Sequence, residues 1–175
     1  RPYKQKRRTR AAMAKEKGLE PLALLAFAQG PAVDMAGAAQ DYIDPEKGVE
    51  TVQDALQGAS DIIAELISDD AGVRGMLREL YWRRAAITSR AAAKDAEDSV
   101  YRLYYEFSSP LSKTQGHQIL AINRGEREEI LKAGVEMDRE TALVALRRRA
   151  VPGRAAMEFV RAAAEDAYDR LISPS

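Results

Sequence analysis

Apolar residues recur at spacings of three and four along most of the chain, a pattern typical of amphipathic helices. The clearest stretch covers 49–67, where polar residues separate six apolar positions: Val49, Val52, Leu56, Ala59, Ile63 and Leu66. A second stretch follows Ser-Asp-Asp at 68–70 and carries Val73, Met76, Leu77, Leu80 and Tyr81. Both stretches predict helices that turn one face toward a core.

Capping residues, glycines and prolines divide the rest of the chain into further helices. Thr9 is placed to cap a helix over 10–17, which Gly18 closes in a left-handed conformation. Pro21 suits the first turn of the next helix, and Asp138 suits the cap of a later one. The remaining predicted helices cover 21–29, 33–41, 95–107, 115–124 (stopped by Gly125), 138–149 and 154–172.

The stretch 131–137 departs from helical spacing. Its apolar residues alternate with Lys132, Gly134 and Glu136, which is the period of a strand. A lone strand needs a partner, and the candidate is the stretch at 87–93. We therefore expect an all-α, multi-helical bundle with room for one short β-strand or hairpin near 128–137.

Length and composition limit the class of protein. The chain has 175 residues and no cysteine, which excludes disulfides, thiol catalysis and Cys-based metal sites and fits a reduced, cytoplasmic setting. No apolar run approaches the roughly 18–20 residues of a membrane span, so we expect no membrane partner. The chain begins at Arg1 rather than Met, and we therefore expect a fragment of a longer protein.

The charge is unevenly distributed. The whole chain has 27 basic and 27 acidic residues, yet its first 17 residues contain eight Lys or Arg against Glu16 alone. Such a segment can neutralise the phosphates of RNA or DNA. The alternative is a solvated terminus, or basic residues that pair with acidic faces of the parent protein. The candidate nucleic-acid-binding residues are Lys4, Lys6, Arg7, Arg8 and Arg10.

Aromatic residues offer a weaker indication of base stacking. Tyr101 and Tyr105 would share a face of the predicted helix, and Trp82 stands beside Arg83 and Arg84. Aromatic residues at helical spacing more often pack in a core, and we expect packing in both places.

Catalytic patterns are missing from the sequence. His117 is the single histidine, and no serine lies in a nucleophile elbow. We expect a structural role for His117. The alternative is a hydrolase whose active site combines His117 with Ser112 or Asp138. The sequence contains neither GxGxxG nor GxxxxGK(S/T), the two common glycine-rich motifs that bind phosphate. Its acidic stretches suit helix caps better than a calcium-binding loop. We expect no enzyme, no metal site and no cofactor.

Several stretches, in order along the whole chain, resemble the Tex family of bacterial transcription accessory proteins. The opening YKQKRRTRAAMAKEKGLEPLA (3–23) is followed by DPEKGV (44–49), YYEFSSPL (104–111), HQILAINRGE (117–126) and EDAYDRLISPS (165–175). The resemblance implies that residues 1–175 are a helical, N-terminal-region-like part of such a protein, preceding its YqgF-like domain. The YqgF-like, helix-hairpin-helix and OB-fold RNA-binding domains would then lie outside this chain.

The resemblance also implies the partners. The full-length protein would bind RNA or DNA, chiefly through its OB-fold domain, and would act with the transcription machinery in the cytoplasm. We therefore expect a non-catalytic helical scaffold whose basic N-terminal segment adds nucleic-acid backbone contacts. The alternative is a protein-interaction module that docks on the rest of the Tex-like chain or on RNA polymerase.

Overall fold

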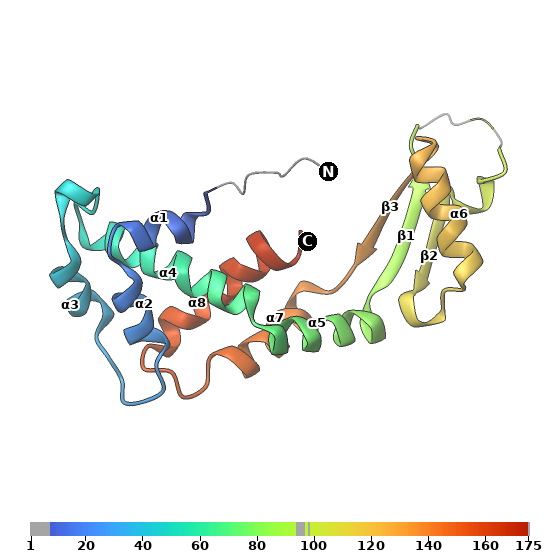
Figure 1. Ribbon diagram of the computed structural model, residues 1–175. Coiled ribbons are helices and arrows are strands. Elements are labelled where there is room, and N and C mark those ends of the chain that lie inside the picture. Colours follow the sequence, from blue (N-terminus) through green and yellow to red (C-terminus); the bar gives the residue numbers. More distant parts are fainter. Residues whose placement is uncertain (1–7, 94–96, 98, 175) are drawn as a thin grey trace. The chain divides into compact units, whose positions relative to one another are not determined.

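The computed structural model describes residues 8–93, 97 and 99–174 (Figure 1). The chain divides into two compact units, Arg1–Arg74 with Leu143–Ser175, and Gly75–Ala142. Eight α-helices and three strands occur among the described residues, so the expectation of a mostly helical chain is confirmed. The fold is not all-α, however, because the second unit contains a three-stranded sheet.

The first unit is helical. Its helices are α1 (Arg10–Glu16), α2 (Glu20–Phe27), α3 (Met35–Ala39), α4 (Val52–Asp69) and α8 (Met157–Ala167), and a π-helical segment, Tyr168–Ile172, follows α8. The predicted capping residues act as expected at the first of these. Thr9 accepts a hydrogen bond from the Ala12 amide at 3.0 Å, and Gly18 ends α1 with a φ of +79°.

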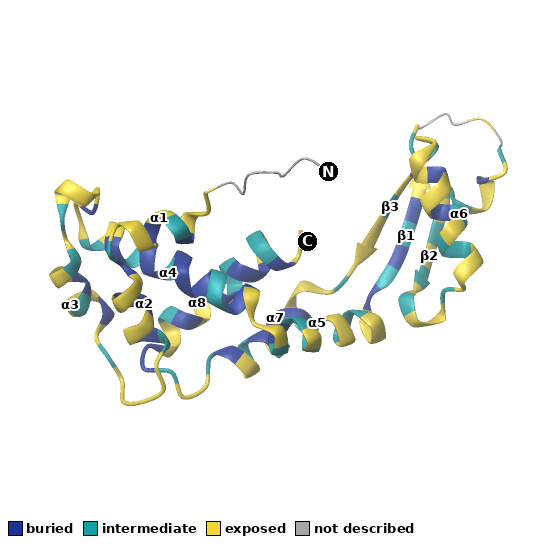
Figure 2. Cartoon of the chain, viewed as in Figure 1, coloured by how far each residue is buried: buried dark blue, intermediate teal, exposed yellow. Residues whose placement is uncertain are grey.

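The long helix α4 is the centre of this unit and contacts α1, α2, α3 and α8 (Figure 1). Figure 2 shows buried residues along α4 and along the side of α8 that faces it. The predicted apolar face is partly correct, since Ala59 and Ile63 are buried but Leu56 and Leu66 are only half-buried. Because helices surround α4 on several sides, burial extends beyond one stripe to Ala55, Ile62, Ala64 and Ile67.

Small residues allow α4 to approach its neighbours closely. A Cβ added at Gly58 would lie 2.2 Å from Cδ1 of Leu19 and 3.3 Å from Cβ of Ala14. Leu19 is fully buried and Ala14 nearly so, which leaves little room for either to move. Glycine at position 58 is therefore a packing requirement.

The division between the units falls within α5 (Ala71–Arg84) and α7 (Arg139–Ala150). The caps predicted for both helices are confirmed. Asp70 accepts hydrogen bonds from the amides of Gly72 and Val73, at 2.7 and 3.1 Å. Asp138 accepts from the Thr141 amide at 3.1 Å and from its hydroxyl at 2.6 Å.

The sheet of the second unit has the order β2–β1–β3, with both pairs antiparallel. The strands are β1 (Ala86–Ala91), β2 (Glu106–Pro110) and β3 (Leu131–Glu136). The strand predicted near 128–137 and its partner at 87–93 are thus confirmed. In β1, Ile87 and Ser89 are buried while Arg90 is exposed, the alternation expected of a sheet covered on one face.

The helix predicted over 95–107 is wrong. This part of the chain holds a short 3₁₀ turn, Arg102–Tyr104, and then β2, in which Phe107 lies opposite Ser89. Aromatic residues are common in strands as well as at packed positions of helices. Here the backbone pairing with β1 selects the strand. The local pattern alone did not contain this information.

The helix α6 (Gly116–Arg127) packs against β3. It continues through Gly125, which was expected to stop it. A Cβ at Gly125 would lie 2.5 Å from Cδ1 of Leu131 and 3.2 Å from the Tyr101 ring, so this glycine also serves close packing. Across the part of the chain that the structure describes, no helix is both long and apolar enough to cross a bilayer.

We predict that Gly58→Ala lowers the free energy of unfolding by about 1–3 kcal/mol, because the added methyl group overpacks against Leu19 and Ala14. Gly75→Ala is the matched control. Gly75 is an exposed position of α5 with nothing within 4 Å of an added Cβ, so alanine should stabilise the chain by up to about 1 kcal/mol. Urea unfolding of both variants measures the difference, and equal effects would contradict the packing account.

A pH dependence follows from the Asp138 cap. The hydrogen bonds from Thr141, the side-chain one first, lower the pKa of Asp138 below its ordinary value of about 4. The cap therefore stabilises the fold above about pH 4 and loses its contribution as the pH falls through the lowered pKa.

Unfolding curves of the parent and of Asp138→Asn should differ most near neutral pH and should converge in acid. Asp41→Asn removes the same charge from an exposed position and controls for net charge. A difference that stays constant from neutral pH to about pH 2 would show that the ionised cap contributes nothing.

Candidate nucleic-acid interface

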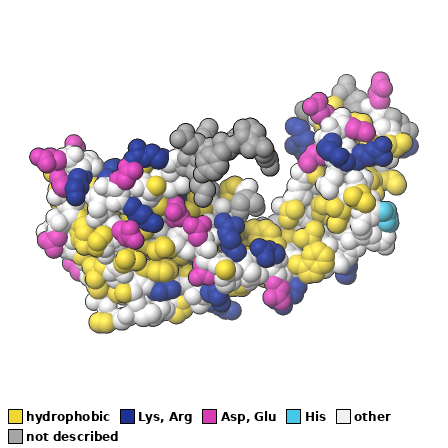
Figure 3. Space-filling view, in the orientation of Figure 1, with side chains coloured by type: hydrophobic (Ala, Val, Ile, Leu, Met, Phe, Trp, Pro, Cys, Tyr) yellow, Lys and Arg dark blue, Asp and Glu magenta, His cyan; other side chains and the backbone are white. Residues whose placement is uncertain are grey.

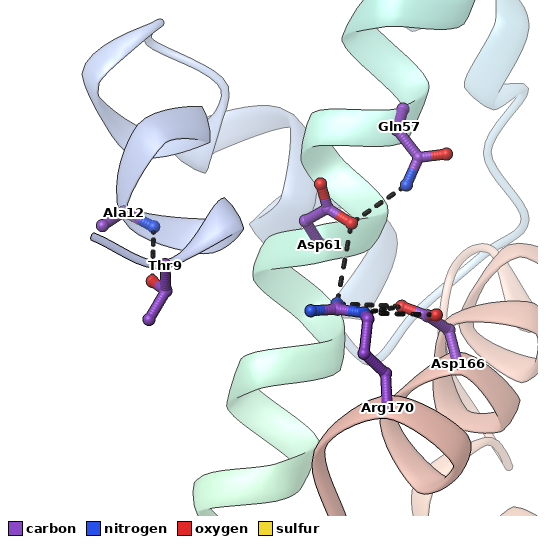
Figure 4. Close-up of polar contacts among 6 residues, drawn as sticks. All are labelled: Thr9, Ala12, Gln57, Asp61, Asp166 and Arg170. Atoms are coloured by element: carbon purple, nitrogen blue, oxygen red, sulfur yellow. Dashed lines mark hydrogen bonds and ion pairs between the residues drawn. The ribbon is translucent and has the colours of Figure 1, made fainter. Parts of the chain in front are cut away.

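The cap of α1 sets the position of the basic residues nearest to it. Lys4, Lys6 and Arg7 lie outside the described residues, so the structure places Arg8 and Arg10 only. Thr9 is the N-cap, with extended backbone angles and the hydrogen bond to Ala12 that Figure 4 shows. Arg8 therefore immediately precedes the cap, and Arg10 is the first residue of the helix.

Arg8 and Arg10 differ in what surrounds them. The Arg8 guanidinium forms an ion pair with Glu16 at the other end of α1, and the two side chains are 63% and 59% exposed. An exposed pair of this kind stabilises a protein by only about 0–1 kcal/mol, so a phosphate can compete with Glu16 for Arg8. Arg10 is exposed and has no ion pair within the described ranges.

Arg10 lines a small surface hollow of about 190 Å³ between α1 and α4. Lys17 and the carboxylates of Asp54 and Asp61 also line it, so the hollow itself has no net excess of positive charge. Figure 3 shows the same mixture more widely, with Lys and Arg side chains interleaved with Asp and Glu over the helices of the first unit. Of the predicted basic residues, the structure therefore places Arg8 and Arg10 at the start of α1, beside a hollow of mixed charge.

Two lysines of this region lie close to the glycines that end helical turns. Gly18 ends α1 and Gly48 ends the 3₁₀ turn Pro45–Lys47, both with positive φ. The Lys47 ammonium lies 3.6 Å from the position of a Cβ on Gly18, and the Lys17 side chain comes within 3.5 Å of that position on Gly48. Each lysine side chain thus lies close to the glycine that ends the other's helical turn.

A partly buried cluster of charges joins α4 to α8 and the segment after it (Figure 4). Asp61 is 7% exposed and accepts a hydrogen bond from Gln57 at 2.9 Å. The Arg170 guanidinium lies 3.7 Å from Asp61 and 2.9 Å from Asp166. The hydrogen bond with Asp166 raises the pKa of Arg170, although burial opposes this, so the side chain remains a cation. This arginine is committed to the fold rather than to an external anion.

The aromatic residues divide between packing and exposure. Tyr101 is buried; burial and the Glu128 carboxylate both raise the pKa of its hydroxyl. Tyr104 contacts Phe107 edge to face at 5.2 Å. The packing interpretation is thus confirmed for this group, although not on a helix. It is wrong for Trp82, which is 53% exposed beside Arg83.

The structure gives His117 no catalytic partner among the described residues. It is exposed at the start of α6, and neither Ser112 nor Asp138 forms a hydrogen bond with it in that part of the chain. Asp138 serves instead as the cap of α7. Among the described residues, no group of three or more His, Asp or Glu side chains could hold a metal ion.

The sequence alone did not predict the two clusters in which charged side chains contact other segments of the same chain. The Asp166–Arg170 spacing of four residues on a helix was visible in the sequence and could have indicated that pair. Nothing in the sequence linked Asp61 to Arg170, or Lys17 to Gly48, because these contacts join distant segments.

Comparison with known proteins shows that this chain is similar to parts of much longer proteins. A family model described as Tex central region-like matches residues 30–172. The match confirms the resemblance to the Tex family, although the family model describes as central a region that the resemblance had suggested to be N-terminal.

Three relatives illustrate the similarity. The uncharacterized protein YdcI of Bacillus subtilis (strain 168) is 42% identical over 180 residues, covering 100% of this chain and 25% of its own length. The transcriptional accessory protein Tex of Neisseria gonorrhoeae is 35% identical over 136 residues, covering 77% and 18%. The S1 RNA-binding domain-containing protein 1 of Pongo abelii is 30% identical over 190 residues, covering 99% and 19%. This chain therefore spans a quarter or less of the length of these relatives.

We predict that Arg170→Ala destabilises the chain by about 2 kcal/mol, because it leaves the buried carboxylate of Asp61 without its cation. The figure lies below the range for fully buried pairs because Arg170 is 26% exposed. Arg161→Ala is the control: its pair with Glu165 is 3.9 Å long and half-exposed, and its loss should cost less than about 0.5 kcal/mol. Similar losses for both variants in urea unfolding would contradict the assigned role of Arg170.

Proposed function

This chain belongs to the Tex central region-like family, and on that premise we propose that it is a non-catalytic helical scaffold of a transcription accessory protein acting in the cytoplasm. Its basic N-terminal segment adds contacts to the backbone of RNA or DNA. The names of two relatives support a role in transcription and a contact with RNA, since one is a transcriptional accessory protein and another is named for an S1 RNA-binding domain. The whole of residues 1–175 serves as one scaffold region in this proposal.

The position of Arg10 is the observation that carries the proposal. Its guanidinium is exposed at the first turn of a helix that is fixed to α4, and it has no ion pair within the described part of the chain. Arg8 lies two residues away and is held by an exposed carboxylate that a phosphate can displace. Lys4, Lys6 and Arg7 precede these residues directly and extend the proposed contact.

The mixed charge of the first unit limits the size of the contact. Lys17 and Lys47 lie close to Gly48 and Gly18, and Arg170 pairs with two carboxylates. The proposed nucleic-acid surface is therefore a short basic segment at the end of a scaffold. Such a surface neutralises a few phosphates without reading the base sequence.

A protein-interaction module is the second candidate. The Arg8–Glu16 pair shows that this arginine can be satisfied by a carboxylate, so an acidic protein surface can take the place of a phosphate. The partner would be another part of the Tex-like chain or RNA polymerase. Binding experiments with nucleic acid separate the two candidates.

We predict that the chain binds a short single-stranded RNA, and that the affinity falls steeply between about 50 and about 200 mM salt. Arg10→Ala should weaken binding and reduce the slope of log K against log salt by about 0.7, the loss of one phosphate contact on a single strand. Arg8→Ala should have a smaller effect. Glu16→Ala should tighten binding, because it frees Arg8 from its intramolecular partner.

Arg148→Ala is the control for net charge, since Arg148 is an exposed residue of α7 outside the proposed surface. It should change the affinity much less than Arg10→Ala. Absence of binding at about 50 mM salt, or equal effects of the two variants, would reject the backbone contact and leave the protein-interaction candidate.

A further inference from the structure

The first unit has an open groove of about 610 Å³ that has no part in the proposed nucleic-acid contact. Its walls come from the segment before α3 and from the start of α8. The apolar lining includes Val33, Met35, Met157 and Phe159. Met157 is 50% exposed, and a flexible methionine side chain can adapt to different apolar partners.

Backbone pairing gives the groove a defined wall. The Val33 amide donates to the Ala155 carbonyl at 2.9 Å, and the Gly30 amide donates to the Gly153 carbonyl at 3.1 Å. The Ala155 amide in turn donates to the Ala28 carbonyl at 2.8 Å. The two segments that form the groove are thus held together by backbone hydrogen bonds.

The arginine in the lining is already committed. The Arg154 guanidinium stacks over the Phe27 ring, 3.8 Å from its centroid. It also donates to the carbonyl of Phe27 at 2.8 Å and to that of Ala150 at 3.0 Å. Arg154 therefore belongs to the wall, where these contacts hold its guanidinium against Phe27 and Ala150.

The other charged residues of the lining are acidic. Asp34 and Glu158 are both exposed, and neither has an ion pair among the residues that the structure describes. Asp34 immediately precedes α3, and Glu158 lies in the first turn of α8. An apolar floor with two carboxylates fits a cationic amphipathic occupant and repels a polyanion.

We propose that this groove binds a basic amphipathic polypeptide segment, with apolar side chains against Met157 and Phe159 and a Lys or Arg beside Asp34 and Glu158. The volume is within the range of binding sites for small molecules or a few side chains. The groove and the start of α1 are thus two surfaces of opposite charge, for two classes of partner.

The test uses the whole 175-residue chain and a fluorescent helical peptide of about 14 residues built from Leu and Lys, with a Leu and Glu peptide of the same pattern for comparison. The Leu–Lys peptide should bind at least about tenfold more tightly than the Leu–Glu peptide. Met157→Ser and Glu158→Gln should each weaken its binding by about three- to fivefold.

Leu103→Ser and Glu136→Gln are the matched controls, because both residues are exposed and lie outside the groove lining. The affinity of these two variants for the Leu–Lys peptide should stay within about twofold of the parent's. Equal binding of the two peptides would overturn the proposal, and so would unchanged affinity in the Met157 and Glu158 variants. Because those two variants should leave RNA binding intact, failure of this proposal is distinguishable from failure of the nucleic-acid contact.

Discussion

The close approach of α4 to the corner between α1 and α2 is the contact on which the first unit depends. It requires Gly58 where the side chains of Ala14 and Leu19 meet the helix. This contact holds α1, a helix too short to be stable alone, in a fixed place. The positions of Arg8 and Arg10 follow from it, since the Thr9 cap joins both residues to a helix that packing has fixed.

Charge in this unit stabilises the fold before it serves any partner. Lys17 and Lys47 lie close to the glycines that end each other's helical turns, and Arg170 pairs with the buried Asp61 of α4 and the half-buried Asp166 of α8. The protein has as many acidic as basic residues. The surfaces that we assign to partners are the start of α1 and the acidic rim of the groove beside α8.

Local chemistry in the sequence predicted much of the helical part. Thr9, Asp70 and Asp138 cap helices as their side chains indicate, and Gly18 adopts the left-handed conformation. The alternation at 131–137 predicted a real strand. The strand β2 was missed because aromatic spacing fits two secondary structures, and only pairing with β1 selects one. The groove also escaped prediction, since backbone pairing between residues 28–33 and 153–155 builds it from segments with no shared pattern.

The central claim is that an RNA backbone contacts the start of α1 and avoids the acidic groove. Amide NMR spectra of the ¹⁵N-labelled chain, recorded during titration with a short single-stranded RNA at low salt, test it most directly. The account predicts shifts at Arg8, Arg10 and their neighbours in α1 that reverse when salt is added. Shifts that centre on Asp34 and Glu158, or spectra that do not change, would contradict it.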